Sequence, residues 1–284
     1  MGATTATLLI SCSDQPGLVA KFANFIYEKG GNIIHADQHT DFAAGLFLTR
    51  IEWQLDGFRL SRELIASAFD EIAQPLKATW QIHFSDTARR IAIWVSRQDH
   101  CLLDLIWRQR AGELAAEIGL IISNHDNLRP IAEQFNIDYH YIPITNENKL
   151  EQEAKQLELL RKYNIDLVVL AKYMQIISGD FITKFSQVIN IHHSFLPAFV
   201  GANPYHQAYK RGVKIIGATA HYVTKDLDQG PIIEQEVVRV SHRDEAVDLI
   251  RKGKDLERVV LARAVRLHLQ NRVLIYGDRT VVFD

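Results

Sequence analysis

Asn190 and His192 are the residues whose types and spacing most clearly suggest chemistry, and they open the run Asn190-Ile191-His192-His193-Ser194-Phe195-Leu196-Pro197. Side chains alternate along a strand, so both would project to the same side at the end of an apolar strand predicted over residues 188–191. An amide beside an imidazole suits a carbonyl substrate, because the amide N–H stabilises an oxyanion and the imidazole exchanges protons. The alternative is structural: Asn190 satisfies backbone groups at the strand end and His192 is a hydrogen-bonded core residue. The spacing alone does not separate these two interpretations.

A second polar cluster follows between two apolar segments and consists of His221 and the run Asp226-Leu227-Asp228-Gln229-Gly230-Pro231. Asp228 lies 36 positions after His192, so only the fold could bring the two side chains together. A carboxylate there would orient the imidazole, favour its protonated form and order a water molecule. The alternative is again structural, because Asp and Gly near Pro are typical of a tight turn.

The elements that must position these residues belong to the second part of the chain, which follows a short polar stretch at 85–90. The predicted strands are 90–96, 118–123, 139–142, 165–170 and 188–191, and the predicted helices are 102–110, 128–135 and 149–163. This alternation predicts a Rossmann-like, doubly wound, mostly parallel α/β sheet, in which ligands bind at the carboxyl ends of the strands. Residues 215–223 and 232–240 would form a hairpin-like pair, and 245–269 a long amphipathic helix.

The first part of the chain has a different order of elements. Strands are predicted at 6–12, 33–40, 46–53 and 78–84, with one helix after residue 17 that stops at Gly30-Gly31 and another at 61–72. Asp14 is the predicted N-cap of the first helix, and Pro16 suits its first turn. The order predicts a ferredoxin-like βαββαβ unit. We therefore expect two domains, 1–85 and 86–284, with the boundary near Asp86.

Composition excludes several classes of function. The 284 residues carry 32 Lys plus Arg against 34 Asp plus Glu, so no global field favours nucleic acid or an anionic membrane. The two cysteines, Cys12 and Cys101, are far apart and lack zinc-site spacing, which fits free thiols in a reducing cytoplasm. The first ten residues do not resemble a signal peptide, and no apolar stretch approaches the roughly 18 residues of a membrane span. The expected protein is cytoplasmic, with neither nucleic acid nor membrane as a partner.

The second part resembles the folate-dependent formyltransferase family from residue 89 to 284. The resemblance rests on the two clusters above, on Ser194-x-Leu196-Pro197, and on Gly217-x-Thr219-x-His221-x-Val223. It implies a catalytic trio of Asn190, His192 and Asp228 acting on 10-formyltetrahydrofolate, supported by Ser194 and His221. The folate-binding residues that it implies are Met174, Gln175, Ile176, Ile177, Thr224, Lys225 and Leu227. Folate would be the substrate, so neither a cofactor nor a metal is expected.

The first part resembles an ACT domain, a ligand-sensing module, through Asp14-Gln15-Pro16-Gly17-Leu18-Val19 and Gly30-Gly31-Asn32-Ile33. The resemblance implies a regulatory amino-acid site that includes Asp14, Gln15, Gly17, Leu18 and Asn32. It also implies a homo-oligomer, since ACT sheets commonly pair side by side and bury their edge strands. The alternative is that the first loop is only a helix cap and that the domain serves oligomerisation alone.

The fusion of these two modules is similar to the architecture of the formyltetrahydrofolate deformylases, which implies hydrolysis of 10-formyltetrahydrofolate to formate and tetrahydrofolate. Relatives that formylate glycinamide ribonucleotide hold its phosphate in a Gly-rich loop, whereas the corresponding run, Ser96-Arg97-Gln98-Asp99-His100-Cys101, contains no glycine. Asp99 would repel a phosphate, although Arg97 could partly compensate. Such an enzyme balances one-carbon folate pools and supplies formate for purine synthesis. A transferase to a small amine and a non-catalytic sensor of folate and an amino acid remain as alternatives.

Two other hydrolase chemistries fit the residues poorly. Ser194, His192 and Asp228 have the residue types of a serine triad, but no G-x-S-x-G elbow occurs. A metal hydrolase is disfavoured because adjacent histidines on a strand should point apart, and no HExxH motif occurs. The histidines that it would use are His192, His193, His206 and His221.

Overall fold

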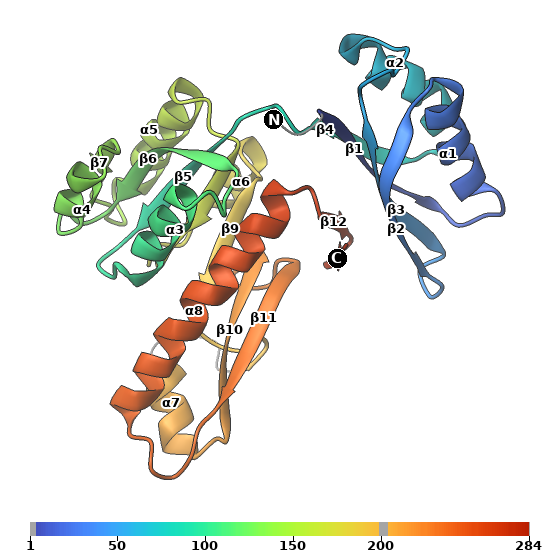
Figure 1. Ribbon diagram of the computed structural model, residues 1–284. Coiled ribbons are helices and arrows are strands. Elements are labelled where there is room, and N and C mark those ends of the chain that lie inside the picture. The colour runs from blue at the N-terminus through green and yellow to red at the C-terminus, as the bar shows by residue number, and fades with distance from the viewer. Residues whose placement is uncertain (1–3, 199–203, 284) are drawn as a thin grey trace. The chain divides into compact units, whose positions relative to one another are not determined.

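The computed structural model describes residues 4–198 and 204–283 (Figure 1). The chain divides into two compact units, residues 1–88 with 271–284, and residues 89–270. The expected boundary near Asp86 lies close to this division. The expected second domain ran to residue 284, whereas residues 271–284 group with the first unit. No helix within the described ranges is both long and apolar enough to span a bilayer.

The first unit has the predicted βαββαβ order. Its elements are β1 (Thr5–Ser13), α1 (Leu18–Glu28), β2 (Asn32–Asp41), β3 (Leu46–Gln54), α2 (Arg62–Ala73), the short 3-10 helix η1 (Gln74–Leu76) and β4 (Thr79–Phe84). The sheet has the strand order β2-β3-β1-β4. Both helices lie on one face of it (Figure 1). Strand alternation sends Leu8 and Ile10 into the core that Phe22 and Phe69 of these helices help to fill.

The predicted helix cap is wrong. α1 begins after Gly17, which has a positive φ of 88° and provides no side-chain cap. Asp14 instead donates its backbone N–H to the carbonyl of Gly45, 2.9 Å away. Glycine adopts this left-handed backbone without strain, so the turn itself, and not an aspartate side chain, leads into the helix.

The other face of the first sheet is covered by a C-terminal hairpin, β12 (Val273–Tyr276) and β13 (Arg279–Val282). Leu274 and Phe283 pack there against Leu9 and Leu48, whose side chains alternate away from the helices. Arg50 Nε donates to the carbonyl of Asn271 at 3.0 Å. These contacts explain why the end of the chain belongs to the first unit.

The second unit is built on a seven-stranded sheet of order β11-β10-β9-β8-β5-β6-β7. Its strands are β5 (Arg89–Val95), β6 (Ala116–Ser123), β7 (Tyr139–Tyr141), β8 (Leu167–Leu170), β9 (Val188–His192), β10 (Ile215–Tyr222) and β11 (Ile232–Arg239). The first five strands run parallel to one another, while β10 runs antiparallel to β9 and β11. The mostly parallel sheet and the predicted hairpin-like pair are therefore confirmed.

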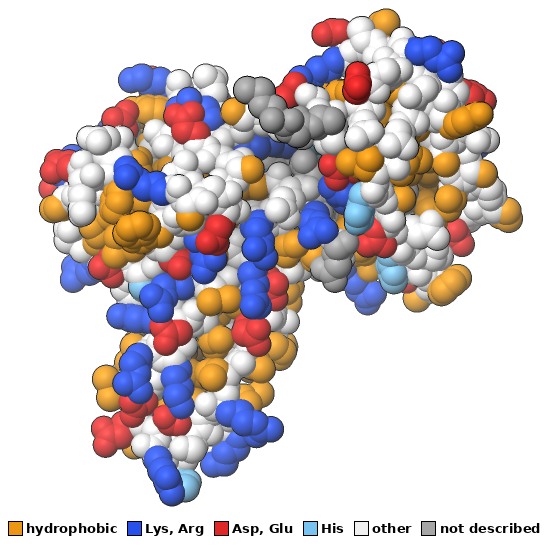
Figure 2. Space-filling model, viewed as in Figure 1, with side chains coloured by type: hydrophobic (Ala, Val, Ile, Leu, Met, Phe, Trp, Pro, Cys, Tyr) orange, Lys and Arg blue, Asp and Glu red, His pale blue; other side chains and the backbone are white. Residues whose placement is uncertain are grey.

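Helices cover this sheet and frame its strand ends. They are α3 (His100–Arg110), α4 (Arg129–Gln134), α5 (Lys149–Lys162), α6 (Gly179–Lys184), α7 (Pro204–Arg211) and α8 (Ala246–Leu269). The sequence did not predict α6 and α7, because helices this short show too few turns for an apolar period. Charged side chains cover the exposed face of α8 (Figure 2), whereas Glu257 on the same helix is buried.

Candidate active site

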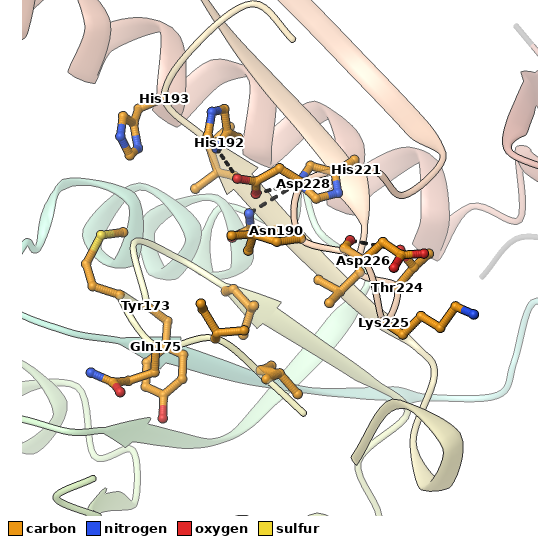
Figure 3. A pocket seen from close by; sticks show the side chains of 17 residues that line it. Tyr173, Gln175, Asn190, His192, His193, His221, Thr224, Lys225, Asp226 and Asp228 are labelled. Atoms are coloured by element: carbon orange, nitrogen blue, oxygen red, sulfur yellow. Dashed lines mark hydrogen bonds and ion pairs between the residues drawn. The ribbon is translucent and has the colours of Figure 1, made fainter. Parts of the chain in front are cut away.

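A cavity of about 390 Å³ lies at the carboxyl ends of β8 and β9, and the loop between β10 and β11 forms one of its walls (Figure 3). The catalytic candidates Asn190, His192 and Asp228 all line it. The folate-binding candidates line it too: Met174, Gln175, Ile176, Ile177, Thr224, Lys225 and Leu227. The fold therefore brings together two segments that the sequence could relate only by resemblance.

Asp228 reaches His192 because the β10–β11 loop folds back tightly on β10. Asp228 adopts a left-handed backbone with a φ of 55°. A Cβ on Gly230 would lie 1.7 Å from the carbonyl oxygen of Tyr222, so only glycine allows this close approach. The result is an Asp228 Oδ2 to His192 Nδ1 distance of 3.3 Å. The motif Asp228-x-Gly230 thus has a steric basis.

The His221 ring faces both the amide of Asn190 and the carboxylate of Asp228 (Figure 3). The antiparallel pairing of β9 with β10 sets His221 opposite Asn190, and His221 Nε2 lies 3.3 Å from Asn190 Nδ2. The same nitrogen is 3.7 Å from Asp228 Oδ1. His221 Nδ1 faces the carbonyl oxygen of Tyr222 at 2.8 Å and therefore carries a proton. His221 thus contacts both of these neighbouring side chains.

The electrostatics of this group favour an ionised carboxylate beside an imidazole. Burial by itself would raise the pKa of Asp228, but hydrogen bonds from His192 and His221 lower its pKa well below the usual range. His192 Nε2 is buried and has no hydrogen-bond partner in the described part of the chain. An unpaired buried ring nitrogen is unfavourable, and this nitrogen is free to exchange a proton with a substrate.

The other wall of the cavity is the loop from Tyr173 to Ser178, which α5 holds at both ends. Ser178 donates its backbone N–H to Glu153 Oε1 at 2.9 Å and its hydroxyl to Glu153 Oε2. Gln156 Nε2 donates to the Tyr173 hydroxyl at 3.1 Å. Glu153 and Gln156 lie three residues apart and therefore share one face of α5. Met174 and Ile176 of this loop present exposed apolar side chains to the cavity.

Ser194 is the one supporting candidate that does not line the cavity. Its hydroxyl donates to the carbonyl oxygen of Ala198 at 2.6 Å, and its own carbonyl accepts from Thr219 Oγ1 at 2.8 Å. Ser194 therefore stabilises the turn after β9. A hydroxyl tied to Ala198 is not paired with His192 as a nucleophile would be.

The expectation that His192 and His193 point apart is wrong. Their rings are stacked, with centroids 5.0 Å apart and an angle of 17° between the planes. β9 ends at His192, so the alternation of a strand no longer applies to His193. Strand alternation therefore did not predict His193 as a residue of the cavity wall. His206 is exposed on α7.

The regulatory candidates of the first unit do not gather into one site. Asp14, Gln15 and Gly17 are exposed, Leu18 is buried in the core, and Asn32 donates to Gln54 Oε1 at 3.1 Å. A cavity of about 190 Å³ lies nearby, between α1, β2 and β3, but none of these five residues lines it. Its lining is Val19, Phe22, Ala23, Ile33, Ala36, Asp37, Gln38, Phe47, Thr49 and Ile51.

Comparisons with known proteins agree with this architecture. The formyl transferase family matches residues 89–265, and the ACT domain family matches residues 6–74. A formyltetrahydrofolate deformylase from Synechocystis sp. is 70% identical over 98% of both chains, and one from Bacillus subtilis is 49% identical over 98% of this chain and 93% of its own.

Solved structures show the same relationship. A crystal structure of a formyltetrahydrofolate deformylase from Pseudomonas syringae is 46% identical, with a TM-score of 0.97 over 100% of this chain and 96% of its own. A glycinamide ribonucleotide transformylase from Symbiobacterium toebii is 31% identical, with a TM-score of 0.66, and covers 71% of this chain and 97% of its own. Of these two structures, the deformylase matches both domains of this chain, whereas the transformylase matches only part of it. The chain therefore belongs to the formyltetrahydrofolate deformylase family.

Proposed function

We propose that the protein hydrolyses 10-formyltetrahydrofolate to formate and tetrahydrofolate. The observation that carries the proposal is the cavity in which Asn190, His192 and Asp228 converge opposite an apolar loop. The apolar wall suits a pterin ring, and the polar wall suits a formyl group that lies between an amide and an imidazole.

The proposed reaction begins with a water molecule near Asp228 that attacks the formyl carbon. The carbonyl oxygen becomes an oxyanion, which the Asn190 amide and the protonated His192 stabilise. The tetrahedral intermediate then breaks its bond to N10. Asp228 and His192 relay the proton from the attacking water to N10, so that formate and tetrahydrofolate leave. These steps use only side chains and water, and folate is the substrate, so no cofactor forms part of the proposal.

The start of α3 supports water as the acceptor. A helix N-terminus commonly binds phosphate, as a phosphorylated amine would require. Here α3 follows Asp99, and its first residue, His100, places Nε2 2.6 Å from Glu257 Oε2. Burial would raise the pKa of Glu257, but a hydrogen bond from His100 and the charge of Lys172 lower it to about 2. A phosphate at this helix end would approach the Asp99 carboxylate, and the His100 side chain is already bound to Glu257, which disfavours the transferase alternative.

The test is formate release from 10-formyltetrahydrofolate by the purified protein without any added amine. We expect turnover in buffer alone and loss of turnover in Asp228→Ala. Strict dependence on an amine would instead indicate a transferase. Folate binding without turnover under either condition would indicate a sensor.

The cellular role and regulation form a second part of the proposal. Hydrolysis would balance formylated and free tetrahydrofolate and supply formate for purine synthesis. Both Cys12 and Cys101 are free thiols, which fits a cytoplasmic protein. The edge strands β2 and β4 of the first sheet suit pairing in a homo-oligomer, and an amino acid could bind this unit as an effector. Sedimentation and the formate assay repeated with individual amino acids test these points.

A further inference from the structure

A line of buried polar side chains runs from α8 to the catalytic histidine. Glu257 on α8 is 1% exposed and accepts hydrogen bonds from His100 Nε2 at 2.6 Å, Tyr205 at 2.7 Å and Lys172 Nζ at 3.2 Å. Lys172 Nζ also lies 3.1 Å from His193 Nδ1. His193 stacks on His192, so a fixed charge pair lies one ring away from the reaction site.

The local structure holds this line in place. Gly253 lies one turn before Glu257, and a Cβ there would be 2.1 Å from the ring of Tyr205, so glycine lets the Tyr205 hydroxyl reach the carboxylate. Lys172 follows β8 with a left-handed φ of 65°. Such a backbone is strained for lysine and persists only when the surroundings favour it. The ion pair with Glu257 is a contact that offsets this strain.

The hydrogen bond with Lys172 determines which nitrogen of His193 carries a proton. An ammonium group has donors and no acceptor, so His193 Nδ1 must be the acceptor. The ring is then neutral and carries its proton on Nε2. Burial, the charge of Lys172 and the charge of His192 lower the pKa of His193 to about 4.

The other charged groups near His193 do not reverse this preference. Glu257 and Asp228 each raise the pKa of His193, but they rank below burial, Lys172 and His192 among its causes. Tyr205 contributes a ring whose centroid is 6.2 Å away. The charges that face His193 from the loop after β8 and from β9 therefore outweigh those from α8 and the β10–β11 loop.

Two stacked imidazoles disfavour double protonation, because like charges at this distance repel each other. Only one ring of the pair therefore carries a positive charge at a time, and the ion pair determines which one. We propose that Lys172, held by Glu257, is a positioning residue of the reaction, whose ammonium keeps His193 neutral so that the proton stays on His192 beside Asp228. This inference deepens the proposed function and rests on it, since His192 is the ring that stabilises the oxyanion.

The direct test is a pH titration of the protein labelled with 15N-histidine, with ring resonances followed by NMR and His193 assigned through His193→Gln. In the wild type we expect His193 to remain neutral as the Nε2–H tautomer at pH 6. In Lys172→Met we expect the pKa of His193 to rise by roughly one unit or more. The kcat for formate release should stay near the wild-type value at pH 7 and fall roughly twofold or more below it at pH 5, where His193 of the variant begins to take up the proton. KM should be nearly unchanged, because Lys172 does not line the cavity.

Tyr205→Phe is the matched control. It removes a neutral hydrogen bond from the same Glu257 oxygen and leaves every charge in place. We expect this variant to keep the wild-type pH dependence of kcat, even if its activity falls uniformly. Lys172→Arg keeps the positive charge and should restore a neutral His193.

Several results would overturn the inference. One is a Lys172→Met enzyme in which the pKa of His193 and the pH dependence of kcat are both unchanged. Another is a Tyr205→Phe enzyme in which these two quantities change as much as they do in Lys172→Met. If Lys172→Met does not fold by circular dichroism, Lys172→Gln makes the same comparison with a polar side chain. A wild-type His193 that titrates near 6.5 would overturn it without any variant. The titration reports on His193 whatever the reaction is, so a wild type without formate release would count against the proposed function alone.

Discussion

Asp228 Oδ2 lies 3.3 Å from His192 Nδ1, although the two residues come from different elements and neither can approach the other through local structure. The contact depends on the antiparallel pair β10 and β11, whose connection folds back over the end of β9. The parallel strands β8 and β9 position His192, and the antiparallel strands β10 and β11 position the carboxylate of Asp228. The site therefore forms where the sheet changes from one pattern to the other.

Asp228→Asn should lower kcat by about 10²–10⁴-fold, because the amide keeps the shape of the side chain but neither stabilises a cationic His192 nor accepts a proton. KM should change little. Formate release at saturating substrate measures the effect. Asp180→Asn, on the exposed first turn of α6, is the control and should behave as the wild type. A variant at position 228 with normal kcat would contradict the assigned role.

His221→Phe should lower kcat by roughly 10- to 100-fold through loss of orientation of Asn190 and Asp228. The ring is similar in size, but neither nitrogen remains to contact these residues or the carbonyl of Tyr222. Because His221 acts through the same group, its effect should shrink strongly in an Asp228→Asn background. Steady-state kinetics of both single variants and the double variant measure this coupling. Fully additive effects would show that His221 acts independently.

The sequence predicted those parts of the fold that local patterns determine. Strand β9, the end of α1 at Gly30-Gly31 and the long helix α8 follow from apolar periods and from glycine punctuation. It failed where the decisive contact is distant or where an element is short. Nothing in the amphipathic pattern of α8 shows that Glu257 binds Lys172, and the hairpin of residues 273–282 gains its stability from a sheet formed by the start of the chain.

The candidate site followed a similar rule. Asn190 and His192 could be paired from strand alternation alone, whereas Asp228 and His221 needed the family resemblance. His193 was misplaced for a physical reason, because alternation was applied one residue beyond the end of β9. The regulatory candidates around Asp14 were taken from a loop pattern, and the cavity of that unit has other walls.

Glu153→Gln should raise the KM for 10-formyltetrahydrofolate roughly three- to tenfold, with a smaller change in kcat. The two Glu153 oxygens accept from the backbone N–H and the hydroxyl of Ser178. The substitution replaces one of these oxygens with an NH₂ group, which donates and cannot accept. The loop from Tyr173 to Ser178, which we propose binds folate, should then lose one of its two anchors on α5. Glu158→Gln, exposed on the same helix, is the matched control. An unchanged KM in Glu153→Gln would show that the loop does not depend on this anchor.

Phe283→Ala should lower the free energy of unfolding of the first unit by roughly 3 kcal/mol. Phe283 is 1% exposed and packs with Leu9, Leu48 and Leu274 on the face of the sheet away from the helices. Ile275→Ala is the control, since Ile275 lies in the same hairpin and is 46% exposed. Urea unfolding followed by circular dichroism measures both variants. Equal stability of the two would mean that the hairpin does not stabilise this unit.

Glu257 should make the stability of the second unit depend on acid pH. Burial raises its pKa, yet a hydrogen bond from His100 and the charge of Lys172 lower it from 4.5 to about 2. A carboxylate with a lowered folded-state pKa stabilises the protein fully above its unfolded pKa, and this contribution disappears as pH falls from about 4.5 towards 2. Asp228 adds a dependence of the same sign below its ordinary value of 3.8.

Glu257→Gln should therefore be less stable than the wild type at pH 6, because Lys172 loses its counter-charge, and its stability should fall less steeply between pH 4.5 and 3. Urea midpoints across this range measure the slope. Glu158→Gln serves as the control, because an exposed glutamate should leave the slope as it is in the wild type. Parallel curves for Glu257→Gln and the wild type would show that Glu257 is not the group whose protonation weakens the fold in acid.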